Sequence, residues 1–534
     1  MKRIKNIALM GIALSAATLT ACQTDFAEIN TDHRHPTEKD LEMDNLNSGG
    51  LVTALEENIF PVGNSGTAYV NEYQVAYTLS SSCWMGYIAP TQNKWEGTLP
   101  PTFALKQRSK QTYDDMAGKG YQSWLELKDK LKNDPAAFAV GQIIKIAAVH
   151  KAADTFGPIP YSKAAIKGSS QTEYDAQEDV YKQMLEELDA AVTALSNNKH
   201  NVFTRYDVIY EGDYNKWMKF ANSLMLRLAM RCYYANEEMS KTYVQKACTN
   251  PGGLIAVASE GAKLCKGAGI QYKNPLVIIN DPGYNDARMG AEIGTYLQGY
   301  NDPRLSVYFT KGNYKGKSGY YGVRTNMPKV DSYIKVGEFS QLNVQNETPL
   351  YIMRASEVEF LLAEAALRKM PGVQGDAKSH YEKGIKLSFE ENGIAASEFG
   401  KYIAQKDAKQ AKFEDVANSQ YSTAAVSEIT IPWANNADLE TNLERIITQK
   451  YLALYPDGQE AWSEYRRTGY PKIFPAVANH TDCGVDGNKR PTRIPYSNEE
   501  YTDNNANILK AVQLLGGAGD LGSTRVWWDK KPNK

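Results

Sequence analysis

The sequence has almost no net charge, because 60 Lys and Arg residues stand against 62 Asp and Glu residues. A chain without a basic field has nothing to concentrate it on nucleic acid or on an anionic membrane surface. We therefore expect no nucleic-acid partner.

Cysteine is scarce and shows no pairing pattern. Of the six cysteines, Cys22 belongs to an N-terminal motif described below, and the other five are odd in number and lack CxxC spacing. Such a set does not predict a disulfide framework, although one isolated disulfide stays open. These five residues are Cys83, Cys232, Cys248, Cys265 and Cys483.

Metal and cofactor motifs are also missing. The six histidines contain no HExxH pattern, and only His33 and His35 stand close together, in a polar stretch. The segment 312–318 departs from a phosphate-binding loop because Lys311 replaces the glycine that such a loop needs. We expect no cofactor and assign no metal ligands, although a calcium ion in the Asp- and Asn-rich stretch at 280–286 stays open.

No pair of residues fits a catalytic centre. Glycoside hydrolysis needs two carboxylates about 5 to 9.5 Å apart. Glu357 and Glu364 share one face of a predicted helix, but seven residues at about 1.5 Å rise separate their backbones by roughly 10 Å. We expect each of these carboxylates to be a buried or rim residue paired with an arginine, and we do not expect an enzyme.

The N-terminus has the pattern of an exported lipoprotein. Basic residues precede an apolar run at 7–19 that is too short to span a bilayer, and this run ends in Leu-Thr-Ala-Cys at 19–22. The pattern predicts a signal peptide at 1–21 and lipidation of Cys22, followed by a polar tether at 22–50. The alternative is an ordinary signal peptide with an incidental cysteine.

Helical periodicity dominates the rest of the chain, which we expect to form a single domain over 51–534. Apolar residues recur at helical spacing over about 136–154, 178–195, 214–234, 350–367, 373–391, 413–427 and 443–454. Adjacent pairs joined by short turns favour stacked helical hairpins, hence a mostly α fold. The segment of about 250–350 is rich in Gly, Asn, Pro and Tyr and predicts an irregular, loop-rich insertion.

Several motifs recur in the order and spacing of a known family. They are the cysteine motif at 19–22, FAEINTD at 26–32, DTFGPIPY at 154–161, WMKFANSL at 217–224, NDPRL at 301–305, the helix at 353–366, QKYLAL at 449–454, RRTGYP at 466–471 and VWWD at 526–529. Over nearly its whole length the chain resembles the SusD/RagB family of glycan-binding lipoproteins, and more closely its SusD-like starch-binding branch.

The resemblance implies a fold and a role. The fold would be helical hairpins of the tetratricopeptide type, with the insertion forming the ligand face. The protein would be anchored in the outer membrane at the cell surface. There it would capture an oligosaccharide and deliver it to a SusC-like TonB-dependent transporter. A peptide ligand stays open, and the rival functions are a surface glycan hydrolase and an adhesive or structural lipoprotein without a small ligand.

The ligand site is expected where aromatic residues crowd a proline-bounded loop at 80–101. Tyrosine is abundant, with 34 copies against 14 Phe, and such rings combine an apolar face with a polar group. In the resembled family an arc of aromatic rings stacks on sugars. We therefore expect Trp84 and Trp95 to be stacking platforms. The alternative, for each predicted aromatic residue, is that its ring packs beneath its loop. The other predicted ligand residues are Tyr87, Asn93, Tyr284, Asn285, Tyr296 and Tyr320.

Overall fold

The computed structural model describes residues 46–62, 68–164, 171–267, 270, 272–328, 335 and 337–532. The predicted signal peptide at 1–21, Cys22 and the tether up to residue 45 lie outside the described residues. The last five residues of the predicted tether, 46–50, are helical, because α3 spans Leu46–Glu57. Residues 51–534 form one compact unit.

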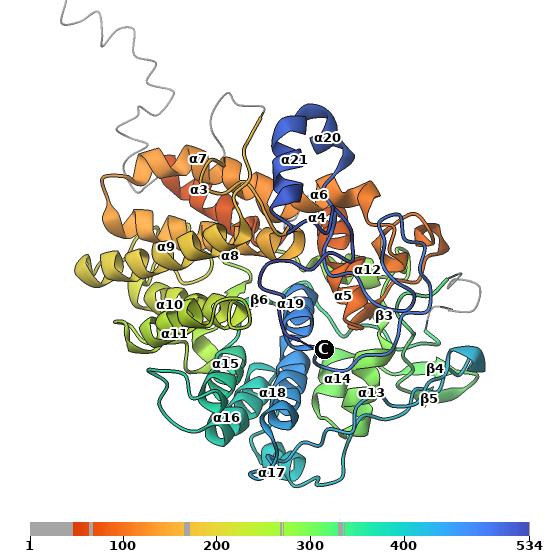
Figure 1. The fold of residues 1–534 in the computed structure, drawn as a ribbon. Coiled ribbons are helices and arrows are strands. Elements are labelled where there is room, and N and C mark those ends of the chain that lie inside the picture. Colours follow the sequence, from red (N-terminus) through yellow and green to blue (C-terminus); the bar gives the residue numbers. More distant parts are fainter. Residues whose placement is uncertain are drawn as a thin grey trace, which may run out of the picture. The chain divides into compact units, whose positions relative to one another are not determined.

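Long helices make up the scaffold of this unit, and most of them pack as antiparallel neighbours in the chain. Contacts join α8 to α9, α10 to α11, and α15 to α16, and successive pairs touch through α9–α10, α10–α15 and α15–α18. Figure 1 shows α7 to α11 and then α15 and α16 following one another on one side of the unit. The predicted mostly α fold of stacked hairpins is confirmed. The scaffold helices are α7 (Lys119–Leu131), α8 (Pro135–Phe156), α9 (Gln177–Asn197), α10 (Tyr214–Arg231), α11 (Glu237–Thr249), α15 (Ala355–Leu367), α16 (Ala377–Glu391), α18 (Leu439–Leu454) and α19 (Gly458–Thr468).

Shorter elements complete the described part. The other α-helices are α4 (Ala68–Tyr73), α5 (Ser81–Trp84), α6 (Ser109–Tyr113), α12 (Pro275–Asn280), α13 (Ala291–Gly299), α14 (Arg304–Tyr308), α17 (Ser397–Ile403), α20 (Asn498–Asp503) and α21 (Asn505–Gln513). Two π-helical turns are η2 (Gln74–Thr78) and η6 (Asp114–Gly118), and the 3-10 turns include η3 (Asn93–Trp95) and η4 (Pro100–Thr102). The strands are β1 (Ile88–Ala89), β2 (Ala262–Leu264), β3 (Arg288–Met289), β4 (Gly312–Tyr314), β5 (Lys317–Gly319) and β6 (Leu350–Met353).

Local signals in the sequence fix the ends of α8. The Asp134 carboxylate accepts hydrogen bonds from the N–H groups of Ala136 and Ala137, and Pro135 occupies the first turn, where its missing N–H costs nothing. The helix stops at Gly157, whose φ of 86° suits a residue without a Cβ. Among the described residues α8 alone is long and apolar enough to cross a membrane, but 89% of its apolar stretch is buried inside the protein.

Two predicted helices were wrong in part or in full. Residues 350–353 form strand β6, because they pair with β2 before α15 begins at Ala355. The segment 413–427 is irregular: the Asp415 carboxylate accepts the N–H groups of Ala417 and Asn418, and the Asn418 side chain accepts the next free N–H at Gln420. Short polar side chains that bond to the backbone in this way compete with helix formation.

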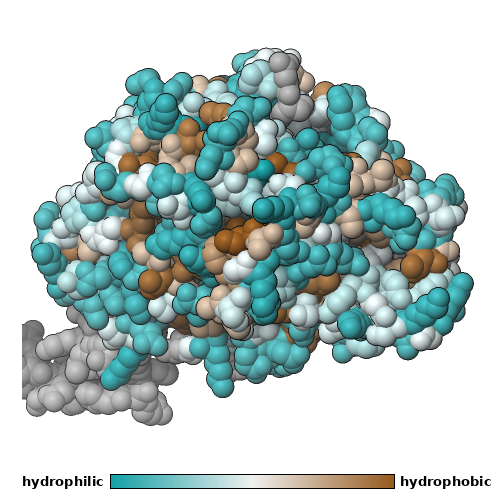
Figure 2. All heavy atoms as spheres, turned by 90° about the horizontal axis from the view of Figure 1, so that it is seen from below, coloured by the Kyte–Doolittle hydropathy of each residue, from teal (hydrophilic) through white to brown (hydrophobic). Residues whose placement is uncertain are grey.

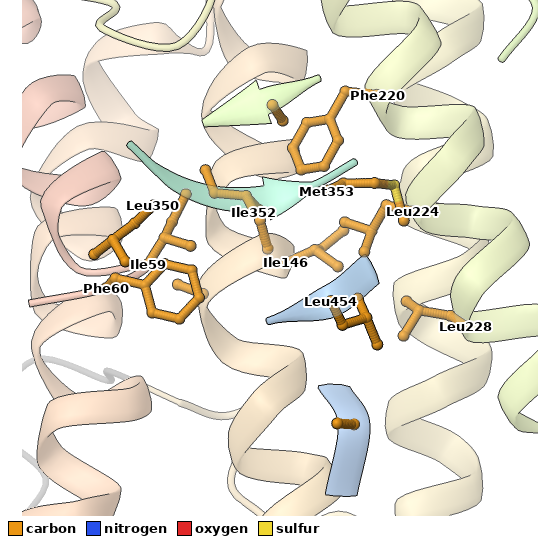
Figure 3. Packing of buried hydrophobic residues seen from close by; sticks show 14 of the residues in the cluster. Ile59, Phe60, Ile146, Phe220, Leu224, Leu228, Leu350, Ile352, Met353 and Leu454 are labelled. Carbon is orange, nitrogen blue, oxygen red and sulfur yellow. The ribbon is translucent and has the colours of Figure 1, made fainter. Parts of the chain in front are cut away.

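Strand β6 runs through the core between the hairpins. Ile352 and Met353 are almost fully buried, as are Phe220 and Leu224 of α10. Figure 3 shows the β6 side chains beside these two residues and beside Ile146 of α8. The short β2–β6 sheet therefore fills the space that a helix hairpin alone would leave between α8 and α10.

A network of buried ion pairs joins three scaffold helices. Arg231 of α10 lies 2.5 Å from Glu460 and 2.6 Å from Glu464 of α19, and Lys450 of α18 lies 3.1 Å from Glu460. Burial by itself raises the pKa of Glu460, but Arg231 and Lys450 outweigh it and lower that pKa to about 2. These charges are held in the core because each has an opposite partner within contact distance.

The insertion at 250–350 carries α12, α13, α14 and the small β4–β5 hairpin, which Figure 1 shows on the other side of the unit from α9 and α11. It is attached to the N-terminal part of the chain through β3, which pairs antiparallel with β1. Figure 2 shows one face of the molecule that is mostly hydrophilic, with hydrophobic residues in scattered groups rather than in one continuous patch.

Candidate ligand-binding site

The two regions that were expected to form the ligand face meet at the β1–β3 pair. Ala89 of β1 lies opposite Arg288 of β3, and the chain leaves β1 directly into the loop 91–98, which contains η3. The residues that precede β3 belong to the turn after α12. Sheet pairing thus brings the loop 91–98 and the segment 284–288 side by side.

Asp286 organises this junction. One oxygen of its carboxylate accepts the N–H groups of Thr91 at 2.8 Å and Gln92 at 3.2 Å. The other oxygen accepts the Trp95 indole N–H at 2.6 Å and the Gln74 amide at 2.7 Å. One buried side chain of the insertion therefore holds both the backbone of the loop and its tryptophan.

Tyr284 and Asn285 complete the connection. The Tyr284 hydroxyl donates to Gln74 Oε1 at 2.7 Å, and the Tyr284 carbonyl accepts the Gln92 amide at 2.7 Å. The Thr91 hydroxyl donates to the Asn285 carbonyl at 2.6 Å. Asn285 has a φ of 52°, a left-handed conformation that Asn tolerates better than most residues and that turns the chain toward β3.

Burial dominates the electrostatics of the junction. It raises the pKa of Asp286 to about 7, and the hydrogen bonds from Thr91 and Trp95 offset this only in part. The Lys94 ammonium lies 4.2 Å from the centre of the Trp95 ring, close enough for a cation–π contact. Trp95 is partly exposed, so its ring is held at a fixed place at the surface.

The structure corrects the predictions for three residues. The side chains of Trp84, Tyr87 and Tyr296 are fully buried and offer no ring face to a ligand. The Trp84 N–H donates to the Pro100 carbonyl at 2.9 Å, and its ring meets Trp462 edge-on. The Tyr87 hydroxyl donates to the Tyr451 carbonyl, and the Tyr296 hydroxyl to the Lys472 carbonyl at 2.7 Å. These rings pack under their loops, which was the alternative interpretation.

The remaining two predicted residues are Tyr320 and Asn93. Tyr320 is partly buried in the strand connection after β5, and the Lys311 ammonium lies 5.8 Å from its ring centre. Asn93 belongs to η3, but its side chain lies outside the described part of the chain. The structure thus brings together Trp95, Tyr284 and Asn285 of the eight predicted ligand residues.

Sequence reasoning missed Gln74 and Asp286, which connect the three. Gln74 lies in the π-helical turn η2, and Asp286 in the turn after α12. The only available signal was the concentration of Asp and Asn at 280–286. Within the described residues no group of three His, Cys, Asp or Glu side chains is placed to hold a metal ion.

The two carboxylates considered for glycoside hydrolysis are ion-pair partners. Glu357 lies 2.6 Å from Arg227, and both side chains are buried. Glu364 pairs with Arg467 at 2.5 Å and Arg368 at 2.8 Å. The expected burial beside arginines is confirmed, and neither carboxylate faces the loop 91–98.

Comparison with known proteins places these features in context. The family model described as SusD-like, Susd and RagB outer membrane lipoprotein, matches residues 28–529. A solved chitin-binding SusD homologue from Flavobacterium johnsoniae has a TM-score of 0.84 at 33% identity, and the match covers 91% of this chain and 99% of that one. A SusD homologue from Bacteroides uniformis gives 0.82 at 33% identity over 90% and 99%, and one from Bacteroides vulgatus gives 0.84 at 28% over 93% and 100%. No curated protein matches the chain by sequence.

Proposed function

Because the chain belongs to the SusD-like family of outer membrane lipoproteins, we propose that it captures an oligosaccharide at the cell surface and delivers it to a TonB-dependent transporter of the SusC kind. The ligand face is formed by the loop 91–98 together with the segment 284–288. The protein supplies binding and orientation, and the energy for import comes from the transporter.

The observation that carries this proposal is the fixation of Trp95. Its indole N–H is held by Asp286 at 2.6 Å while its ring remains partly exposed. An aromatic side chain that is ordered before binding loses little conformational entropy when a ligand stacks on it. Tyr284, held through Gln74, adds a second ring with a polar group beside the same loop.

The first ligand class to test is oligomers of N-acetylglucosamine. The relative from Flavobacterium johnsoniae, at 33% identity, is a chitin-binding SusD homologue. Sugars of this class present apolar ring faces to aromatic platforms and polar groups to amides and carboxylates. A peptide ligand is the alternative, and a panel of oligosaccharides and peptides distinguishes the two.

Binding without turnover is part of the proposal. The carboxylates of Glu357 and Glu364 form ion pairs with arginines, so neither is available as an acid or a nucleophile at a sugar. Incubation of the purified protein with the bound oligosaccharide should leave its chain length unchanged. Release of shorter products by pure protein would support the rival hydrolase instead.

The test of binding uses isothermal titration with the N-acetylglucosamine hexamer. Trp95→Ala should weaken binding by at least about fivefold, because truncation of a central aromatic anchor costs more than about 1 kcal/mol. The matched control is Trp527→Ala, a partly buried tryptophan that contacts Tyr181 in the scaffold. Equal affinity of wild type and Trp95→Ala would refute the assigned site. Absence of binding to every member of the panel would favour an adhesive or structural role.

Delivery to a transporter is tested in the native membrane. A tagged form of the full-length protein should co-purify with an outer-membrane TonB-dependent transporter after mild detergent extraction. Recovery of the protein alone, under conditions that keep other membrane complexes intact, would contradict this part of the proposal and leave the binding role standing.

A further inference from the structure

A pocket lies at the N-terminal end of α12, whereas the Trp95 site follows the C-terminal end of the same helix. It has a volume of about 260 Å³ and is lined by residues of both the insertion and the scaffold. Its lining includes Tyr308, Tyr351, Arg354, Glu391, Asn392 and Tyr455. None of these residues takes part in the Trp95 site.

Arg354 is the main polar group of this pocket. It follows β6, its side chain is buried, and its guanidinium lies 3.8 Å from the centre of the Tyr351 ring. Nη2 donates to the Tyr455 carbonyl at 3.2 Å, but Nη1 has no hydrogen-bond partner among the described residues. A buried donor without an acceptor costs free energy, so the guanidinium retains capacity for a further polar partner.

Glu391 balances this charge. Its Oε2 lies 3.8 Å from Arg354 Nη1, and its two oxygens accept the N–H and the hydroxyl of Ser356 at 3.0 and 2.5 Å. The pocket therefore combines a strong donor and a strong acceptor without net charge. A neutral ligand whose groups both donate and accept matches such a lining better than an ion does.

Size and shape narrow the ligand further. Pockets for drug-sized ligands span about 300–1,000 Å³, so this pocket suits one small ring rather than a chain. The Tyr308 and Tyr351 rings supply apolar contact, and the Asn392 amide lies beside the Tyr308 hydroxyl at 3.2 Å. A neutral sugar residue matches this lining, because it carries hydroxyl groups around an apolar ring face.

We propose that this pocket is a second binding site, specific for a single neutral sugar residue. The residue is either a free monosaccharide or the end of an oligosaccharide. The choice of sugar as the ligand class rests on the proposed function, whereas the position of the site rests on Arg354, Glu391 and the tyrosines around them.

The test is saturation-transfer NMR with D-glucose, D-galactose and N-acetyl-D-glucosamine on the purified full-length protein. Val344 lines the pocket, so Val344→Phe should block it and remove most of the signal. Trp95→Ala is the matched control and should keep the signal. Thermal unfolding verifies that each variant is folded. If Val344→Phe is unfolded, Asn343→Ala replaces it as the test variant. Asn343 is an exposed residue of the same lining, and its substitution should weaken binding severalfold.

The outcomes separate this site from the Trp95 site. No signal from wild type with any of the sugars, a signal lost in Trp95→Ala, or a signal unchanged in a folded pocket variant would each overturn the second site. The N-acetylglucosamine hexamer is titrated in parallel. Binding of the hexamer without any monosaccharide signal would refute only the second site, and loss of hexamer affinity in Val344→Phe would show that the pocket receives a chain end.

Discussion

Trp84 and Trp95 are neighbours in one short segment but have opposite environments. Trp84 is fully buried against Trp462, whereas Trp95 is partly exposed and held by Asp286. The sequence around both is aromatic and bounded by prolines, so it indicates a crowded loop without showing which ring faces outward. Burial is decided by residues far away in the chain, and position 462 could not be paired with position 84 from local pattern.

Substitution of Trp84 should therefore affect stability. Trp84→Ala leaves a large cavity in the core and should lower the free energy of unfolding by about 3 to 5 kcal/mol. Trp95→Ala should cost less, since part of the ring is already in contact with water. Chemical denaturation of both variants measures this difference, and a loss for Trp95→Ala equal to that for Trp84→Ala would mean that its ring is a core residue.

Asp286 should give the protein a distinct pH dependence. Its pKa in the folded state, about 7, is raised above the usual 3.8, so the folded protein binds this proton more tightly than the unfolded chain does. Through this residue the free energy of unfolding should fall as pH rises from about 4 to 7 and should level off above 7.

Asp286→Asn removes this titration while preserving the shape of the side chain. The difference in unfolding free energy between wild type and Asp286→Asn should change across pH 4 to 7 and be constant above pH 7.5. Denaturant titrations at a series of pH values give this difference. A difference that does not vary with pH would show that Asp286 titrates in the folded protein as it does in the unfolded chain.

At the scale of the element, helix α15 shows what periodicity can and cannot predict. The spacing of apolar residues predicted the helix correctly, and Leu361 is 1% exposed. The helix is not buried on one face alone, because residues 355–365 are all buried. The same apolar character in 350–353 was wrongly assigned to the helix. Those residues pair with β2, from which they are separated by most of the insertion. A short apolar run is compatible with either a strand or a helix. The segment with which it pairs or packs decides which of the two forms.

Leu361→Ala should lower the free energy of unfolding by about 2 to 5 kcal/mol, because it removes buried methyl groups from a packed site. The control is Leu509→Ala in α21, because Leu509 is 50% exposed. Its free energy of unfolding should stay within about 0.5 kcal/mol of wild type. The denaturation midpoint and slope are measured together. An unchanged midpoint for Leu361→Ala at unchanged slope would show that this face of α15 is not packed.

The ion pairs between α10, α18 and α19 should stabilise the protein at neutral pH and lose this effect in acid. The pKa of Glu460 is lowered to about 2, below the usual 4.5, so its contribution to stability is complete above about pH 4.5 and is lost as pH falls toward 2. At pH 7, Glu460→Gln should destabilise the protein by about 3 to 5 kcal/mol, because Arg231 keeps a buried charge with one partner fewer.

The matched control for Glu460→Gln is Glu414→Gln, which breaks the exposed pair with Lys412. That pair should contribute almost nothing. Denaturant unfolding at pH 7 and at pH 3 separates the two variants. If Glu460→Gln is as stable as wild type at pH 7, the network does not depend on the Glu460 charge.

For the whole molecule, the motifs indicated the family correctly, and the match extends over residues 28–529. One of these motifs, at 154–161, contains the end of α8 at Gly157. The proposed ligand site could be predicted from the sequence only in part. Asp286, which holds this junction together, is buried, and its partners come from two other segments of the chain, the turn η2 and the loop 91–98.

Membrane attachment is a property of the whole protein and remains a prediction from the cysteine motif at 19–22. Cys22→Ala should prevent lipidation and move the protein out of the membrane fraction, because a stable anchor requires the acyl chains. Fractionation with acyl labelling tests this. Retention of an unlabelled Cys22→Ala protein in the outer membrane would point to attachment through its partner instead.

The junction at Asp286 also limits how binding preferences can be transplanted between relatives. In this protein the Asp286 carboxylate accepts hydrogen bonds from the N–H groups of Thr91 and Gln92 and from the indole of Trp95. A chimaera that receives only the loop 91–98 from another protein would have to make the same hydrogen bonds to Asp286 with different residues. We therefore expect residue 74, the loop 91–98 and the turn before β3 to be exchangeable only as one block.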